Sequence, residues 1–516
     1  MNDWAYGYVS DVPYTAVFYN DQSPIHLNFI CLLNGFLPRR LNTEFTYCEL
    51  GCGCGLTTNV LAAANPMGRF YAVDFHPAHI AEALNTAKGA RLDNVTFFEQ
   101  SFDEFLHETL PDLPAFDFIT IHGVYTWVCP NDRQRIVEII QRRLKTGGIV
   151  YISYNSLPGW CSGEPIQRLL FECGMLFSDR SDRRFERALS LLEDFRNEKS
   201  PILSDDQLFD RITDIKRRGR LRYLTHEYMN ENWQPLYHAD VARHLKAAKL
   251  TFVGSANALD NFPDLNFTKS RQELLSKIGN PEVRETLKDY FVPRLLRKDV
   301  YVRGPLRLNK FHQAEILDQL GLALIVPRQH AKLSMRVPVG EVSVSENVFT
   351  PVLDALAERP HTMNELLTAS GPHEKPSEKA AEIAGILIGT WQAAPVKQEG
   401  AGPGQNAVDR FNFAMSKSAI MGDISENFPL ASSVLGSAVQ ASGLEIFVYQ
   451  AAKQSETLRT EELVARLWKH LVDRGERLEK NGTPLNEETE SRTFLKDTIE
   501  TIVKHKLPVW RNLGIL

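Results

Sequence analysis

The sequence predicts an α/β protein with a Rossmann-like, doubly wound parallel sheet, a helical insertion acting as a lid, and a mostly helical C-terminal domain. Two observations lead to this fold class. Short apolar runs alternate with helical patterns through the first third of the 516-residue chain, which is the order of a doubly wound sheet. The first run also ends in a glycine-rich turn that leads directly into a helix. The expected strands are residues 46–50, 69–74, 95–99, 116–121 and 149–154.

The expected helices carry the residues that usually begin and end helices. An amphipathic helix from about Pro24 to Gly35 starts at a proline and stops at a glycine. A further helix follows the glycine turn at once, and two others end near a glycine. These three helices are expected at residues 56–64, 78–88 and 132–144.

The glycine turn has the features of a ligand-binding loop. Gly51, Gly53 and Gly55 alternate after the first strand, and glycine is needed where the backbone takes a positive φ or approaches a ligand closely. The helix that follows presents free N–H groups to that ligand. Asp74 ends the second strand about 20 residues later, where an acid is placed to bind ribose hydroxyls. An ordinary tight turn is the alternative, and the position of Asp74 counts against it.

The residues around the turn favour S-adenosylmethionine over a dinucleotide. The nicotinamide fingerprint has a glycine where this chain has Leu56, and the Glu49 carboxylate would repel a pyrophosphate. S-adenosylmethionine carries an amino group, a sulfonium and no phosphate, so an acid at this position suits it. We therefore expect the cofactor to contact Glu49, Gly51, Cys52, Gly53, Gly55, Asp74 and Phe75.

Other polar and aromatic residues follow the later strands. Ser101 and Phe102 come after the third strand and are candidates for holding the adenine, and His122 and Gly123 come directly after the fourth. Because the carboxyl ends of parallel strands meet at one edge of the sheet, these residues are expected to share one crevice.

Aromatic residues near these strand ends are candidates for the methyl-acceptor side. Tyr125 and Trp127 are expected to form an aromatic wall, and Tyr14 is placed to reach the acceptor. His122 is a candidate base, with the alternative that it only orients the backbone. Further candidates, for which a packing role is the alternative, are Tyr19, Tyr154, Trp160, His226, Glu227, Tyr228 and Trp233.

Composition excludes several classes of protein. The net charge of −6 and the pI near 6.2 argue against a nucleic-acid binder that relies on bulk positive charge. The seven cysteines show no disulfide pattern and suit a reducing cytoplasm, and Cys52-x-Cys54 lacks the spacing of a zinc site, so no metal is expected. No signal peptide is visible at Met1–Trp4, and no apolar run reaches 18 residues, so no membrane span is expected.

The chain divides into three expected regions. Residues 1–160 form the cofactor-binding core, and residues 161–309 form a lid region in which 240–304 complete the core sheet. The rival interpretation is that residues 220–307 form a separate domain. Residues 310–516 are mostly helical, and 348–397 have the order of a winged helix-turn-helix. Residues 363–368 contain Glu365 and no basic residue, so an interaction or structural role is favoured over DNA binding.

The chain resembles the bacterial class I methyltransferases that carry a methyltransferase regulatory domain. The resemblance covers about residues 8–310. It is carried by the motifs Asp11-Val-Pro-Tyr14, Glu49-Leu-Gly-Cys-Gly-Cys-Gly55, His122-Gly-Val-Tyr-Thr-Trp127 and Tyr154-Asn-Ser-Leu-Pro-Gly-Trp160, and by the stretch from Tyr223 to Gly304. That family includes rickettsial lysine methyltransferases that modify outer-membrane proteins. The resemblance therefore implies N-methylation of a protein lysine, with an outer-membrane protein as one kind of partner.

Three functions follow from these expectations. The first is an S-adenosylmethionine-dependent methyltransferase acting on a protein side-chain amine. The second is a small-molecule methyltransferase of the same fold. The third is a non-catalytic protein that senses S-adenosylmethionine and binds partners through its C-terminal half.

Overall fold

The computed structural model describes most of the chain. The described residues are 7–203, 206–373, 375–397, 405–421, 427–454, 459–480, 483–485 and 487–516. The expectation about a signal peptide concerned Met1–Trp4, which lie outside these ranges.

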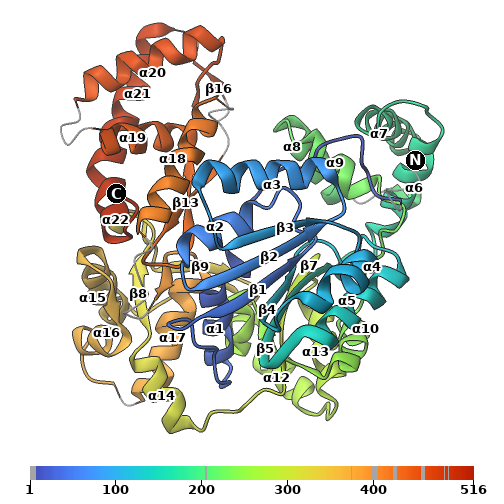
Figure 1. Cartoon of the computed structure of the whole chain (residues 1–516), viewed down its shortest axis with the longest axis horizontal. Coiled ribbons are helices and arrows are strands. Elements are labelled where there is room, and N and C mark those ends of the chain that lie inside the picture. Colours follow the sequence, from blue (N-terminus) through green and yellow to red (C-terminus); the bar gives the residue numbers. More distant parts are fainter. Residues whose placement is uncertain are drawn as a thin grey trace.

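A seven-stranded sheet occupies the centre of the molecule (Figure 1). Its strand order is β3-β2-β1-β4-β5-β7-β6. The first five strands are parallel, and β7 runs antiparallel to both of its neighbours. This topology confirms the predicted doubly wound α/β fold. The strands are β1 (Phe45–Leu50), β2 (Gly68–Asp74), β3 (Val95–Glu99), β4 (Phe116–Ile121), β5 (Leu144–Asn155), β6 (Leu250–Ser255) and β7 (Leu296–Arg303).

The strand β5 is longer than the sequence predicts. It begins at Leu144, immediately after the preceding helix, and not after the Gly147-Gly148 pair. Leu144 is buried and pairs with Phe116, while the register shifts between Phe116 and Phe118. The glycines therefore lie within a strand that bulges, so they do not separate helix from strand.

Alternate side chains of the strands enter two separate cores, as the period of two in a strand requires. Tyr47, Phe118 and Tyr151 face one side of the sheet, with α1 (Pro24–Leu33) and α2 (Leu56–Ala64). Their neighbours in sequence face the other side, with α5 (Pro130–Arg143) and α10 (His238–Leu245). The helix α3 (Pro77–Ala90) packs on β2 and β3, and a short helix, α4 (Phe102–Glu104), follows β3.

A cluster of helices is inserted between β5 and α10. It contains α6 (Glu164–Met175), α7 (Ser181–Asn197), α8 (Asp206–Arg217) and α9 (Leu221–Tyr228). These helices have a hydrophobic core of their own, to which Val9 and Val12 of the N-terminal segment contribute. The start of the chain is thus packed against the insertion.

The strands β6 and β7 extend the central sheet, which is the first of the two alternatives weighed for this stretch. The segments between them are η7 (Ala258–Asn261), α11 (Pro263–Asn266), α12 (Lys269–Ser276) and α13 (Pro281–Phe291). Arg297 on β7 forms ion pairs with Glu285 and Asp289 of α13 and with Asp299 on its own strand. These pairs fasten α13 to the sheet.

The C-terminal region contains a small sheet of order β11-β8-β12. Its strand β8 precedes residues 348–397, for which a winged helix-turn-helix was predicted, and is not part of that prediction. The first elements of the region are α14 (Lys310–Asp318), β8 (Gly321–Leu324), β9 (Ser334–Val337), β10 (Gly340–Ser343), α15 (Glu346–Glu358), β11 (His361–Thr362), α16 (Met363–Ala369), α17 (Pro376–Gly389) and β12 (Ala393–Val396). The chain ends with α18 (Gln405–Met421), β13 (Asn427–Ser432), β14 (Ser437–Ser442), α19 (Gly443–Gln454), α20 (Thr460–Arg474), β15 (Glu479–Lys480), β16 (Thr483–Pro484), α21 (Glu488–Thr501) and α22 (Leu507–Asn512).

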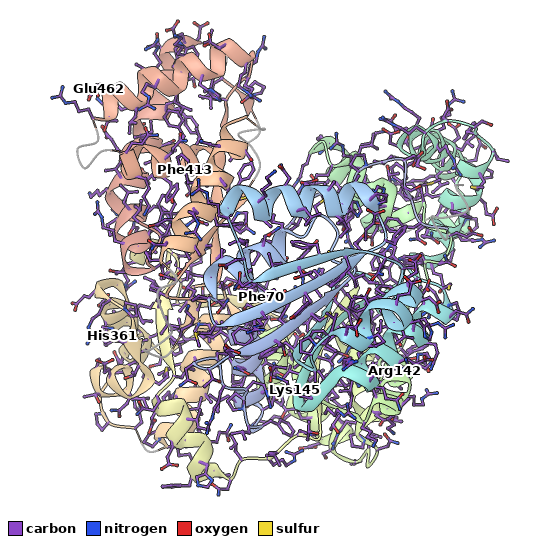
Figure 2. The ribbon with its side chains drawn as sticks, in the orientation of Figure 1. Phe70, Arg142, Lys145, His361, Phe413 and Glu462 are labelled. Carbon is purple, nitrogen blue, oxygen red and sulfur yellow. The ribbon has the colours of Figure 1, made fainter. Side chains whose placement is uncertain are left out.

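The C-terminal region shares a hydrophobic core with the central sheet. Phe349, Ile383 and Phe411 belong to the same buried cluster as Phe70 and Phe118 (Figure 2, where Phe70 is labelled). The helix α18 packs along α3 and α2, and β12 and β13 contact α1 and α2, so the region packs on helices of the core (Figure 1). None of the helices within the described residues has the length and apolar character needed to cross a membrane.

Candidate active site

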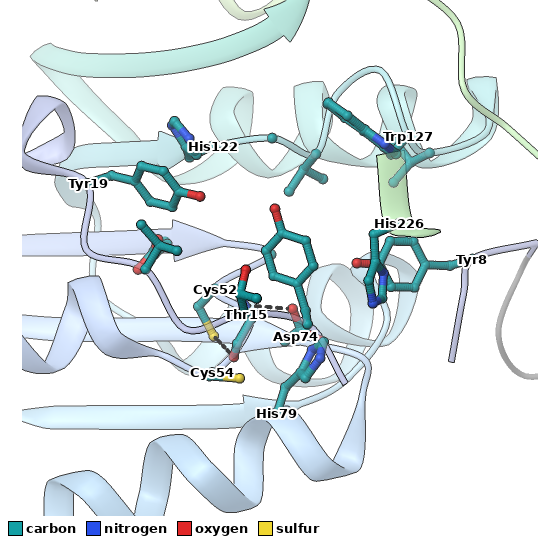
Figure 3. A pocket seen from close by; sticks show the side chains of 18 of the residues that line it. Tyr8, Thr15, Tyr19, Cys52, Cys54, Asp74, His79, His122, Trp127 and His226 are labelled. Atoms are coloured by element: carbon teal, nitrogen blue, oxygen red, sulfur yellow. Dashed lines mark hydrogen bonds and ion pairs between the residues drawn. The ribbon is translucent and has the colours of Figure 1, made fainter. Parts of the chain in front are cut away.

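A cavity of about 380 Å³ opens at the carboxyl edge of the sheet. Its lining comes from the loops after β1 to β5, from the N-terminal segment around residues 8–22, and from α8 and α9 of the insertion (Figure 3). Its size is that of a small-molecule or cofactor site. The insertion and the N-terminal segment therefore cover the edge at which doubly wound sheets bind ligands.

The glycine loop forms the floor of this cavity. Gly51, Gly53 and Gly55 all have a positive φ, of 76°, 53° and 65°. A Cβ on Gly51 would overlap the side chain of Val124, whereas a Cβ on Gly53 would meet no atom within 4 Å. Gly55 does not line the cavity: a Cβ there would lie 2.5 Å from the Ala83 Cβ. The first two glycines shape the cavity, and the third lets α2 pack against α3.

Asp74 organises the same loop from the end of β2. Its Oδ2 accepts a hydrogen bond from the Gly53 N–H at 2.9 Å, and its Oδ1 accepts one from the His76 N–H at 3.0 Å. The Oδ1 also lies 3.2 Å from the His79 Nδ1. Each carboxylate oxygen has two lone pairs, so the group retains acceptor capacity for a ribose hydroxyl.

Glu49 is the second acid on this side of the cavity. It is buried at the end of β1 and accepts a hydrogen bond from the Thr58 hydroxyl. Burial raises the pKa of Glu49 to about 7, because the carboxylate is separated from water. The buried amide of Gln22 lines the cavity as well and has no hydrogen-bond partner among the described residues. A bound ammonium would favour the charged form of the acid.

Three further predicted residues line the cavity beside Asp74. Phe75 is in edge-to-face contact with Tyr8, with ring centroids 5.7 Å apart. Ser101 and Phe102 lie at the start of α4, where the Ser101 hydroxyl caps the helix. This group offers aromatic and polar contacts of the kind that an adenosine requires.

The N-terminal segment brings three tyrosines, Tyr8, Tyr14 and Tyr19, into the cavity (Figure 3). The Tyr14 ring meets the His226 ring edge-on at 4.9 Å, and Tyr8 lies 5.4 Å from the same histidine. Burial holds the pKa of Tyr14 and Tyr19 above the usual value for a tyrosine. These hydroxyls stay neutral, so the tyrosines make their part of the cavity wall aromatic and polar without adding charge.

His122 lies at the end of β4 and faces the same cavity. Its Nδ1 is 2.7 Å from the Tyr151 hydroxyl, and its ring lies 3.7 Å from that of Tyr19. Burial, together with the nearby Lys298, lowers the pKa of His122 to about 3. An imidazole with so low a pKa is a weak base at neutral pH. The geometry favours the orienting role over the catalytic one.

Not every predicted residue reaches the cavity. Those that line it are Tyr14, Glu49, Gly51, Cys52, Gly53, Asp74, Phe75, Ser101, Phe102, His122, Gly123 and Trp127. Tyr125 is instead fully buried in the core beneath α5 and α10, with its hydroxyl 3.4 Å from the His244 Nδ1. The chain turns after β4, so Val124 and Trp127 face the cavity while Tyr125 points into the sheet core. The expectation that Tyr125 forms the acceptor wall is corrected accordingly.

The further candidates for the acceptor side also divide between the cavity lining and the hydrophobic cores. Tyr19, Trp160, His226 and Glu227 line the cavity. Tyr154 lies in the sheet core, where its hydroxyl donates to the Asp299 Oδ2 at 2.6 Å. Tyr228 and Trp233 belong to the core of the helical insertion.

Several polar and aromatic residues of the lining were not identified from the sequence as site residues, among them Tyr8, Gln22, Asn155, Arg211 and Tyr223. Tyr8 lies in a segment without periodicity, so nothing in the sequence marks it. Arg211 and Tyr223 belong to helices of the insertion, and only the packing of α8 beside α9 directs them to the cavity. Asn155 was identifiable in principle, since it ends β5 as His122 follows β4.

Two family models match the chain. A methyltransferase domain matches residues 41–176, which span β1 to β5 and continue into α6. A domain described as a predicted methyltransferase regulatory domain matches residues 220–303, which contain α9, β6 and β7.

Individual proteins are similar to this one over different lengths. An uncharacterized protein of Synechocystis is 36% identical over 525 residues, covering 99% of each chain. A tRNA (guanine-N(7)-)-methyltransferase of Yersinia pseudotuberculosis is 26% identical over 132 residues, covering 23% of this chain and 55% of that enzyme. The structure of PKMT2 from Rickettsia typhi in complex with AdoHcy matches with a TM-score of 0.71 at 17% identity. That match covers 97% of this chain and 100% of the rickettsial chain, and it shows a shared fold.

Proposed function

From the premise that the chain belongs to the class I S-adenosylmethionine-dependent methyltransferases that carry a methyltransferase regulatory domain, we propose that it N-methylates a lysine side chain of a protein. The premise agrees with the resemblance in the sequence. It also makes S-adenosylmethionine the cofactor and methyl transfer the reaction. The lysine acceptor and the residues that bind each ligand are our proposals.

The residues of the cavity fit S-adenosylmethionine. Gly53 leaves open space on the cavity side of the loop, and Glu49 with the unpartnered Gln22 amide offers polar atoms for an amino-acid moiety. We assign Asp74 to the ribose and Phe75 with Phe102 to the adenine. When bound, this cofactor supplies an electrophilic methyl group on a sulfonium, so the protein has mainly to align the acceptor with it.

One observation carries the proposal of a lysine acceptor: three half-buried tyrosines, Tyr8, Tyr14 and Tyr19, line the same cavity as Glu49 and Asp74. An amine attacks only when it is neutral, and a desolvated aromatic environment lowers the pKa of a lysine ammonium. Rings around the nitrogen also stabilise the methylammonium that forms, by about 0.5–2 kcal/mol for each cation–π contact. Trp127 and the tyrosines of the N-terminal segment are placed for this role.

The test is transfer of labelled methyl groups from S-adenosylmethionine to fractionated lysate. We expect label in protein, released as methyl-lysine when the protein is hydrolysed. The Gly53→Ala variant serves as the matched control, because it changes the donor loop alone. Label confined to metabolites would support the small-molecule alternative, and label released as another methylated amino acid would contradict the lysine acceptor.

A further inference from the structure

An acid of the helical insertion, Glu227, lines the cavity. It lies on α9, is 9% exposed and is accompanied in the lining by Tyr223 of the same helix and by Asn155 at the end of β5. None of the roles assigned above uses it. Arg211, Asn155 and Tyr223 are its neighbours in the lining, and all three act to lower the pKa of Glu227. A buried acid in the wall of a ligand cavity is a candidate site for a cationic group of the ligand.

Tyr19 lines the cavity together with Glu49 and Glu227. The charges of both Glu49 and Glu227 raise the pKa of Tyr19. Glu227 also raises the pKa of Tyr14, whereas Asp74 raises that of Tyr8. Glu49, Asp74, Glu227 and the three tyrosines therefore line one cavity. Glu49 and Asp74 lie at the ends of β1 and β2 beside the glycine loop, whereas Glu227 comes from α9, so Glu227 is the acid left for the acceptor.

We propose that Glu227 binds the ammonium of the acceptor lysine and removes its proton before methyl transfer. This inference rests on the proposed lysine acceptor. In this step an N–H bond of the ammonium breaks, an O–H bond forms on the Glu227 carboxylate, and the nitrogen regains its lone pair. Methylation then returns a positive charge to the nitrogen, so one proton is released for each methyl group, and Glu227 is the group that first receives it.

The chemistry of the surroundings suits a proton acceptor. Burial raises the pKa of Glu227 to about 7, although the Arg211 guanidinium acts to lower it. A base works best when its pKa is near the operating pH, and His122, with a pKa of about 3, is too weak. The assignment also gives the matched regulatory domain, residues 220–303, a direct part in the reaction, because α9 belongs to it.

The other groups that face Glu227 do not titrate near neutral pH. Burial raises the pKa of every tyrosine around it, and it lowers the pKa of the neighbouring His226 to about 4. The tyrosines are Tyr14, Tyr19, Tyr223 and Tyr228. Two further groups of the lining are His79, which contacts Asp74, and Glu49, whose pKa burial raises to about 7. Saturation with S-adenosylhomocysteine would hold Glu49 in its charged form.

The experiment measures binding of Nα-acetyl-lysine N-methylamide to the full chain saturated with S-adenosylhomocysteine, from pH 5.5 to 8.5. We expect binding at least about tenfold tighter at pH 8.5 than at pH 5.5, since charge-assisted hydrogen bonds are strong and the carboxylate forms above pH 7. The Glu227→Gln variant should lose this gain and its pH dependence. Its affinity for S-adenosylhomocysteine should stay within about twofold of the wild type. The norleucine analogue, which lacks the nitrogen, should show no pH dependence.

Two controls separate the possible failures. Glu193→Gln, an exposed position on α7, should behave as the wild type, and Glu227→Asp should retain a weakened pH profile. If the wild type binds S-adenosylhomocysteine but not the lysine compound, the proposed lysine acceptor is wrong, and so is the role proposed for Glu227. If the wild type and Glu227→Gln bind the lysine compound equally, only the role of Glu227 is overturned. Loss of S-adenosylhomocysteine binding in Glu227→Gln would show a structural role and would also overturn it.

Discussion

Substituting two glycines of the same loop is expected to separate folding from cofactor binding. Gly53 and Gly55 have similar positive φ values, so alanine at either position meets the same left-handed backbone cost of about 1–2 kcal/mol. They differ in what the new Cβ encounters. At Gly53 no atom lies within 4 Å, whereas at Gly55 the Cβ would lie 2.5 Å from the Ala83 Cβ and 2.7 Å from the Phe97 ring.

The magnitudes follow from this difference. Overpacking in a close-packed core costs about 1–3 kcal/mol, so Gly55→Ala should lower the free energy of unfolding by about 2–5 kcal/mol in total. Gly53→Ala should lower it by only about 1–2 kcal/mol. The added methyl at Gly53 instead enters the cavity where we place the cofactor. It should weaken S-adenosylhomocysteine binding about tenfold, which corresponds to about 1.4 kcal/mol.

Two assays distinguish the variants. Urea unfolding followed by tryptophan fluorescence gives the change in stability, and calorimetric titration with S-adenosylhomocysteine gives the affinity. Below the unfolding transition, Gly55→Ala should keep nearly normal affinity. The reasoning would be refuted if Gly53→Ala bound S-adenosylhomocysteine as the wild type does, or if Gly55→Ala were as stable as the wild type.

Three further predictions concern other parts of the site and the sheet. Glu49→Gln should weaken S-adenosylhomocysteine binding about tenfold at pH 8. The wild type should lose affinity as pH falls through about 7, because Glu49 becomes protonated there, and the variant should not show this loss. Calorimetric titration at a series of pH values measures both effects. Asp117→Asn should cost about 1–3 kcal/mol in urea unfolding at pH 7, because the buried carboxylate binds two cationic side chains that are only about one-third exposed. Burial acts to raise the pKa of Asp117, but those two partners and a backbone N–H hold it below its usual value. The wild type should therefore exceed the variant in free energy of unfolding by the full amount above about pH 4, and this difference should disappear as pH falls through the folded-state pKa. Tyr125→Ala should lower stability by about 3–5 kcal/mol with little change in cofactor affinity, whereas Trp127→Ala should lower turnover up to about tenfold, as measured by methyl transfer per folded molecule.

The fold and the residues that we propose for cofactor binding could be predicted from the sequence, because the patterns that indicate them are local. The glycine spacing around Gly53 reports positive φ angles, and Asp74 is placed by the length of one strand–helix–strand unit. The expected positions of these residues agree with the structure, in which the Asp74 carboxylate accepts a hydrogen bond from the Gly53 N–H. The sequence left two interpretations of residues 240–304, and the strand order places β6 and β7 in the central sheet.

The part of the cavity that we propose for the acceptor was harder to predict, because residues far apart in the sequence form it. Tyr125 and Trp127 are two residues apart, and the sequence does not show how the turn after β4 rotates between them. That rotation sends Tyr125 into the core and leaves Trp127 in the cavity. Arg211 and Glu227 reach the cavity only because α8 and α9 pack over the carboxyl edge of the sheet.

The sequence by itself determined the order of the elements, the donor loop and its two acids, since each depends on backbone geometry and strand length within short stretches. The tertiary structure alone decided which aromatic residues face the cavity and that Glu227 of the helical insertion lines it together with Glu49 and Asp74. The physical reason is that a side chain's burial, and with it the pKa of an acid, depends on packing between elements far apart in the chain.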